Sequence, residues 1–292
     1  PLTVVSAITA GGNITLRATE DGGDDDDLTI SANVQSTGGG LITFDAGHDF
    51  IQTAGTISTT GNVDINADYD GSGVGAINQQ GGTIIASTLF ADAPGEITLN
   101  QITNDFDTLN TTSSGGNDIY VADADGFDVA LANAGTGTLT LVAGGNITDS
   151  GTITASDLIV STVGAGGSIT LDTATNDVDT LSATTAGNQD IIFVDTDGIA
   201  LNTIDAGSGT VRITAGGAIT DNNAGTVNII AGLTVLSGQG GIGSADGIET
   251  QVGNLTAQNV TGGNIWVINT GNLNIYDAVS YTHLTLPTTE RV

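Results

Sequence analysis

The 292-residue chain contains no cysteine, methionine or lysine, and it has only three prolines and one tryptophan. The lack of cysteine excludes disulfide frameworks and thiolate metal sites, although it does not fix the cellular compartment. Aromatic residues make up 4% of the chain, so the core must be built from Ile, Leu, Val and Ala. No run of 18 apolar residues occurs, which excludes a membrane-spanning helix and predicts no membrane insertion of this segment.

Positive charge is also scarce, because three basic residues stand against 33 acidic ones and give a formal net charge of −30. Nucleic acids and anionic membrane surfaces are bound through basic clusters, so we expect neither as a partner. Cations suit such a chain better. Hydrophobic residues make up 38% of the sequence, which is enough to bury a core and argues against disorder.

One segment occurs twice, because residues 95–149 reappear as residues 167–221 at a constant offset of 72. For example, Asn-Asp-Phe-Asp-Thr-Leu at 104–109 matches Asn-Asp-Val-Asp-Thr-Leu at 176–181. Repeats of this kind form stacked units that each bury an apolar face on a neighbour. Fold and function are therefore sought in the stack.

Short stretches of alternating apolar and polar residues, such as Ile14-Thr-Leu16 and Ile97-Thr-Leu99, indicate strands with one face inward. Gly-Gly pairs often precede them, as at Gly145 and again at Gly167. The spacing of these pairs predicts an all-β parallel β-helix of about 22 residues per coil, with roughly three coils in each repeat unit. About 12 to 13 coils would make a rod of roughly 60 Å. A string of β-sandwich modules is the alternative, which the short spacing and the lack of a bulky core anchor disfavour.

The last residues differ from the rest. The stretch 279–288, Val-Ser-Tyr-Thr-His-Leu-Thr-Leu-Pro-Thr, breaks the pattern and resembles the translation of a transposase adapter used in sequencing libraries. We therefore predict one parallel β-helix segment over residues 1–278 and a non-native tail over 279–292, which is excluded from fold reasoning. The chain starts at Pro1 without a methionine, so a fragment of a longer protein is expected.

Two further features carry a family resemblance: the Gly-Gly-Asn-Ile-Thr strands and the segment Ala-Gly-His-Asp-Phe-Ile-Gln at 46–52. Together with the Thr-, Asn- and Gly-rich composition, they resemble repeats of filamentous-haemagglutinin-type exoproteins. The resemblance implies a right-handed parallel β-helix that is secreted or displayed on the outer surface of a Gram-negative bacterium. It also implies adhesion to glycans or proteins on host or neighbouring cells. The Asn-Pro-Asn tetrapeptides of the family's secretion domain are not seen, which leaves the export route open.

An acidic run at residues 21–27 is the candidate metal site. Carboxylate oxygens suit Ca²⁺, which takes six to eight oxygen ligands. The alternative is a solvated loop between coils, since no regular ligand spacing accompanies the run. The candidate calcium ligands are Asp21, Asp24, Asp25, Asp26 and Asp27.

Other motifs have simpler interpretations. The Asp-x-Asp-Gly sequences at 123–126 and 195–198 occur in calcium loops, but the remaining ligands are missing, so turns are expected. Residues 240–246 lack one aspartate of a calcium-binding nonapeptide. His48 is the one histidine within 1–278 and is expected to be an exposed corner residue.

These observations predict a structural and adhesive stalk that binds through many weak contacts, without catalysis and without a required cofactor. A calcium-responsive exoprotein is the alternative. A polysaccharide-degrading enzyme is a third hypothesis, since two aspartates at i and i+2 on a strand face one side about 6.6 Å apart. The scarcity of basic and aromatic residues disfavours it. Exposed strand edges at the ends would favour end-to-end self-association.

Overall fold

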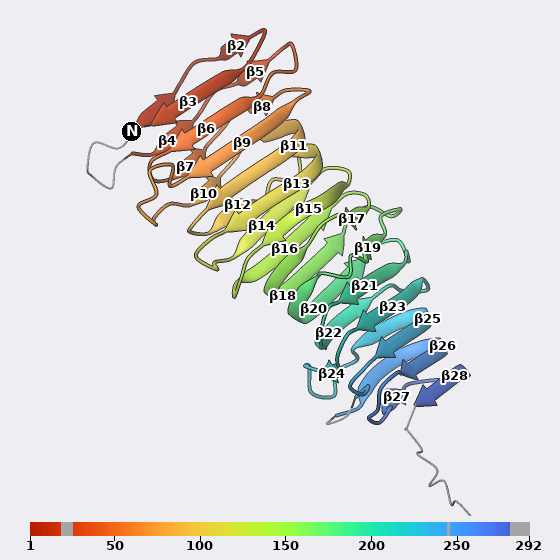
Figure 1. Ribbon diagram of the computed structural model, residues 1–292. Helices are drawn as coiled ribbons and strands as arrows, with labels where there is room; N and C mark the ends of the chain where they lie inside the picture. The colour runs from red at the N-terminus through yellow and green to blue at the C-terminus, as the bar shows by residue number, and fades with distance from the viewer. Residues whose placement is uncertain (19–25, 244–245, 281–292) are drawn as a thin grey trace, which may run out of the picture.

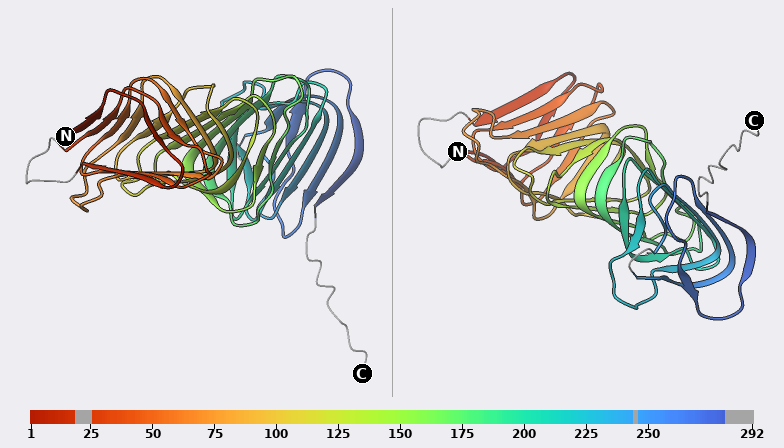
Figure 2. Two further views of the ribbon diagram at one scale, coloured as in Figure 1. Left: turned by 90° about the horizontal axis from the view of Figure 1, so that it is seen from above. Right: turned by 60° about the horizontal axis from the view of Figure 1, so that its bottom comes forward.

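The computed structural model describes residues 1–18, 26–243 and 246–280, which form an all-β solenoid of parallel strands (Figure 1). About 12 turns are stacked roughly 21 residues apart. The predicted all-β parallel solenoid is confirmed, with a spacing close to the predicted one. The first and last described turns lie at opposite ends of an elongated molecule (Figure 2).

The first three turns contain three separate strands each. These strands are β1 (Leu2–Val4), β2 (Ile8–Ala10), β3 (Ile14–Ala18), β4 (Leu28–Ile30), β5 (Val34–Ser36), β6 (Ile42–Ala46), β7 (Phe50–Gln52), β8 (Thr56–Ser58) and β9 (Asn62–Ala67).

In later turns some strands are longer and run round a corner. The first of these, β11, pairs with both β8 and β9. This central group consists of β10 (Ile77–Gln79), β11 (Thr83–Ala93), β12 (Ile97–Leu99), β13 (Asp105–Ser113), β14 (Ile119–Asp123), β15 (Phe127–Asn133), β16 (Thr138–Ala143), β17 (Ile147–Asp149) and β18 (Ile153–Thr162).

The remaining strands continue the same stack. They are β19 (Ile169–Leu171), β20 (Asp177–Thr185), β21 (Ile191–Asp195), β22 (Ile199–Asp205), β23 (Thr210–Ala215), β24 (Ile219–Asp221), β25 (Ile229–Gly238), β26 (Ile248–Asn259), β27 (Val267–Asn269) and β28 (Asn274–Ser280). The last strand runs past the predicted boundary at residue 278, since Val279 pairs with Gln258.

The core consists of columns in which each inward side chain lies on its equivalent in the next turn. In one column, fully buried apolar residues follow one another along the axis: Leu28, Phe50, Ile77, Ile97, Ile119 and Leu139. Burying each such side chain stabilises the fold by about 1.5–3 kcal/mol. The alternation seen in the sequence thus places one face of every strand in a narrow apolar interior.

The two sequence copies are related differently from the prediction. Strands β12–β17 recur in the second copy as β19–β24. Ile97 nevertheless stacks with Ile119 in one column, whereas its equivalent Ile169 stacks with Ile147 and Ile191 in another. With turns spaced roughly 21 residues apart, the repeat offset makes about three and a half turns rather than the predicted three. Equivalent strands therefore lie on different sides of the solenoid.

Close backbone approach explains why glycine occurs at particular corners. A Cβ at Gly144 would collide with the carbonyl oxygen of Ala124 in the preceding turn. Gly55 has a φ of 81°, and a Cβ there would lie 2.5 Å from the carbonyl carbon of Ala32. Both positions thus favour glycine because adjacent turns come within contact distance.

Candidate metal centre and surface carboxylates

Two of the five predicted calcium ligands can be placed in the structure. Asp21, Asp24 and Asp25 lie outside the described residues. Asp26 is buried, with its Oδ1 3.6 Å from the amino group of Pro1. Asp27 is half-buried and lies directly before β4, where it takes part in a different cluster from the one predicted.

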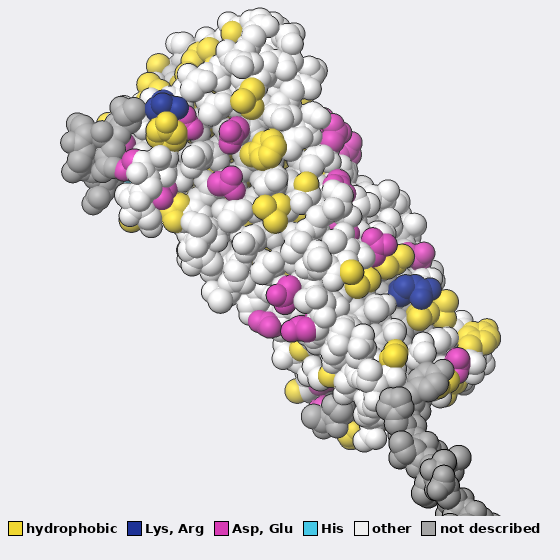
Figure 3. Space-filling view, viewed as in Figure 1, with side chains coloured by type: hydrophobic (Ala, Val, Ile, Leu, Met, Phe, Trp, Pro, Cys, Tyr) yellow, Lys and Arg dark blue, Asp and Glu magenta, His cyan; other side chains and the backbone are white. Residues whose placement is uncertain are grey.

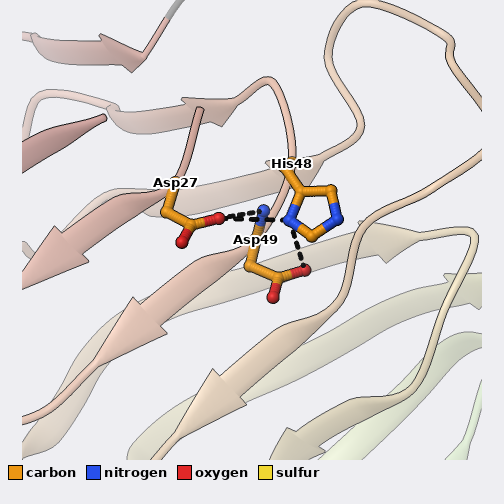
Figure 4. A group of neighbouring side chains, drawn as sticks. All are labelled: Asp27, His48 and Asp49. Atoms are coloured by element: carbon orange, nitrogen blue, oxygen red, sulfur yellow. Dashed lines mark hydrogen bonds and ion pairs between the residues drawn. The ribbon is translucent and has the colours of Figure 1, made fainter. Parts of the chain in front are cut away.

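Asp27, His48 and Asp49 come together at this corner (Figure 4). The Nδ1 atom of His48 lies 3.1 Å from Oδ1 of Asp27 and 3.3 Å from Oδ1 of Asp49. One possible ligand atom from each residue lies within 4.8 Å of those from the other two. An imidazole nitrogen and two carboxylates are a donor set that divalent metals use in proteins.

The parallel register explains why these carboxylates are close. Asp27 and Asp49 stand directly before Leu28 and Phe50, which are partners in the pairing of β4 with β7. The two aspartates therefore occupy equivalent positions in successive turns, where strands are separated by about 4.8 Å. The backbone N–H of Asp49 donates to Oδ1 of Asp27 over 3.2 Å.

This contact belongs to a recurring ladder. A carboxylate or amide oxygen directly before a strand accepts the N–H of the equivalent residue one turn later. The acceptor and donor pairs are Asn13 and Leu41, Asn33 and Thr56, Asp49 and Ala76, Asp118 and Thr138, Asn146 and Ser168, and Asp190 and Thr210. These residues were not predicted from the sequence. The available signal was Asn or Asp immediately before an apolar strand at the coil spacing.

His48 differs from its predicted role. It occupies a corner between β6 and β7, as predicted, but only 26% of its side chain is exposed. The imidazole faces the two carboxylates, and its far nitrogen points away from them (Figure 4). Because the register of Leu28 with Phe50 brings Asp27 beside it, the histidine is part of a cluster rather than a solvated corner.

The Asp-x-Asp-Gly sequences form turns, as predicted, but their two aspartates have different environments. Asp123 is fully buried and accepts the N–H groups of Phe106 and Asp125, whereas Asp125 is exposed. The pair thus does not face one side of a strand. Burial raises the pKa of Asp123 to about 7 against the lowering effect of these hydrogen bonds.

The second copy repeats this environment. Asp195 is buried and accepts the N–H of Val178 over 3.1 Å. Burial raises the pKa of its carboxyl group to about 7 as well. These carboxyls are structural partners of backbone amides, placed at corners where the chain passes into the next strand.

A shallow acidic groove lies outside the corner formed by residues 125–128. Its carboxylates are those of Asp107, Asp125 and Asp128, and Asn146 and Thr148 complete its wall. Thr148 Oγ1 donates to Oδ1 of Asp128 over 3.0 Å. Figure 3 shows that acidic side chains on the visible face form several separate groups rather than one continuous patch. The groove offers hydroxyl-binding acceptors to a ligand at the surface.

Comparison with known proteins supports a repeat region. A family model described as repeats of unknown function, DUF5649, matches residues 116–185. That match runs from β14 to β20 and is about as long as the internal repeat. No curated protein and no solved structure matches this chain.

Proposed function

We propose that this chain is a stalk segment of a large secreted or cell-surface bacterial exoprotein. The observation that carries this proposal is the uninterrupted parallel pairing of successive turns from β1 to β28. Hydrogen bonds between turns run along the long axis, and apolar columns fill the interior along the same direction. Such a stack resists bending and sets a fixed distance between the two ends.

The resemblance to filamentous-haemagglutinin-type repeats supports an adhesive role on a Gram-negative cell. The outward positions carry mainly short polar side chains, as in Thr29, Thr43 and Thr98. Single contacts of such groups with glycans or proteins on another cell are weak. Many of them along one rod gain avidity through effective concentration.

The stalk is tested by placing the chain between a surface anchor and a fluorescent module. About 12 turns at 4.8 Å per turn predict a narrow height distribution near roughly 60 Å. A Gly/Ser linker of the same length is the control, with a broad distribution around roughly 90 Å. A broad distribution for the chain itself would exclude a rigid stalk.

We also propose that the segment is not catalytic. This is supported by the burial of Asp123 within the corner, which separates it from the exposed Asp125. Incubation of the chain with a panel of acidic and neutral polysaccharides should release no reducing ends. Release that is lost in Asp125→Asn would instead support a glycosidase or lyase.

A calcium-responsive exoprotein is the alternative, favoured by the juxtaposition of Asp27 and Asp49 in a chain of net charge −30. Calcium would relieve carboxylate repulsion and stabilise the folded chain. Equal melting temperatures in calcium and in chelator would dispose of this alternative.

Self-association through the ends is a further part of the proposal. The first turn pairs with the second alone, and β27 and β28 pair only with β26 among the described strands. Unpaired strand edges favour end-to-end stacking. Light scattering should show elongated oligomers as concentration rises, and a clean monomer at high concentration would contradict this.

Within the described residues, no helix is long and apolar enough to cross a membrane.

A further inference from the structure

We propose that Asp27, His48 and Asp49 form a binding site for a borderline divalent cation such as Zn²⁺, which joins the second and third turns of the solenoid. This site is independent of the stalk function. It shares Asp27 with the calcium site predicted from the acidic run, but its other ligands, His48 and Asp49, and its metal are different.

Two distances within the cluster match those between neighbouring ligands of one ion, and all three ligand atoms lie within 4.8 Å of one another. Zn²⁺ binds nitrogen and oxygen ligands at about 2.0–2.2 Å, so ligands at tetrahedral or octahedral angles are separated by about 3–3.5 Å. The separations from Nδ1 of His48 to the two carboxylate oxygens are 3.1 Å and 3.3 Å. One ion can therefore contact all three atoms after small side-chain adjustments.

The donor types favour a transition metal over calcium. Imidazole is a ligand of zinc, copper, nickel and iron, whereas Ca²⁺ takes six to eight oxygens. The three side chains are 26%, 34% and 32% exposed for His48, Asp27 and Asp49. Water can thus complete the coordination from the open side.

Backbone amides hold both carboxylates in place. The N–H of Asp49 donates to Asp27, and the N–H of Ala76 donates to Oδ1 of Asp49 over 2.8 Å. Hydrogen bonds of this kind orient metal ligands and reduce the cost of assembling a site. The same ladder supplies Asp118 and Asp190 with amide contacts to Thr138 and Thr210. Within the described residues, the contact between Asp27 and Asp49 is the ladder contact that has a histidine beside it.

Binding at this place has a structural consequence. Asp27 lies before β4, and His48 and Asp49 lie before β7, so an ion links strands that are neighbours along the axis. Because the cation binds the folded arrangement, it stabilises the stack by linkage.

Isothermal titration of the full chain with zinc chloride in a non-coordinating buffer tests the proposal, with X-ray absorption to identify the ligands. We expect one ion per chain, bound by one imidazole nitrogen and oxygen ligands. His48→Ala should weaken binding by about tenfold or more. Asp49→Asn should do the same while leaving an oxygen for the N–H of Ala76.

Three matched variants distinguish zinc binding at this site from zinc binding by other carboxylates or by the tail. Asp118→Asn and Asp190→Asn remove ladder carboxylates elsewhere, and His283→Ala removes the histidine of the C-terminal tail. Each should bind zinc as the parent chain does. Circular dichroism confirms folding of every variant, and His48→Gln replaces His48→Ala should the latter not fold.

Several results would overturn the proposal. Unchanged affinity in folded His48→Ala or His48→Gln would exclude imidazole ligation. Loss of binding in His283→Ala would assign the ion to the tail. Displacement of zinc by equimolar calcium would show that carboxylates alone bind cations, and a melting temperature insensitive to zinc in the parent chain would exclude the link between turns.

Discussion

The carboxylate of Asp123 accepts the backbone N–H of Phe106 over 3.0 Å, and its equivalent in the second copy, Asp195, makes the same contact with Val178 over 3.1 Å. The two aspartates end β14 and β21, which belong to different columns of the stack. The corner and the start of the strand one turn earlier therefore form one local unit in both copies. It keeps its internal hydrogen bonds on either side of the solenoid, which explains how a repeat of about three and a half turns can be accommodated.

These buried carboxyls predict that stability falls as pH rises towards neutrality. Burial raises the pKa of Asp123 to about 7, so the folded chain binds this proton more tightly than the unfolded chain. Its contribution is fully present below about pH 4 and is lost as pH rises through about 7. Asp195 contributes in the same direction. Melting temperatures between pH 4 and pH 8 measure the effect.

The double variant Asp123→Asn/Asp195→Asn is the control, because an amide does not titrate in this range. The difference in melting temperature between parent and variant should shrink or reverse as pH rises. A difference that is constant across the range would show that the carboxyls are ionised throughout.

Glycine substitutions at two corners should have different costs. In Gly144→Ala the new methyl group collides with the carbonyl of Ala124, so the turns must separate, at a cost of about 1–3 kcal/mol. Gly166 meets no atom within 4 Å, and Gly166→Ala should stay within about 0.5 kcal/mol of the parent chain. Chemical denaturation measures both. Equal losses of unfolding free energy in the two variants would contradict the close approach of Gly144 to Ala124.

A row of hydrogen-bonded, buried side-chain amides predicts a second effect on stability. Nε2 of Gln79 donates to Oε1 of Gln52 over 3.0 Å and to Oδ1 of Asn104 over 2.8 Å. Gln79→Leu removes the donor to Oε1 of Gln52, whereas Oδ1 of Asn104 still accepts the backbone N–H of Ile84, and the variant should cost about 1–3 kcal/mol. Gln35→Leu, at an exposed position, is the matched control and should cost little. Similar unfolding free energies for the two variants would contradict a stabilising role for the hydrogen bonds of Gln79.

Core truncation should act locally along the rod. Leu109 is fully buried and stacks between Leu89 and Val129, so Leu109→Ala should cost about 2–5 kcal/mol. Each turn contacts only its neighbours, so hydrogen exchange should accelerate most in β11, β13 and β15. Ile102→Ala, at a position 45% exposed, should leave exchange unchanged. Uniform acceleration along the chain would indicate one global unit.

The sequence predicted the fold well because its main signals are local. Alternation in segments such as Ile97-Thr-Leu99 and the glycine spacing depend on one strand or one corner. The sequence could not predict that equivalent strands of the two copies lie on different sides of the solenoid. Their placement depends on how many residues each corner contains. The cluster at His48 was missed for a related reason. Asp27 and His48 meet only through the register of β4 with β7, which spacing in the sequence does not specify.

The most direct test of the central proposal is an adhesion assay with graded carboxylate replacement on the intact chain. Asp107→Asn, Asp125→Asn and Asp128→Asn alter the acidic groove singly and together, and circular dichroism confirms each fold. The distributed-contact account predicts that each single variant retains most cell binding and that losses accumulate as further sites along the rod are changed. Complete loss of adhesion from one folded single variant would contradict it and place binding in a discrete site.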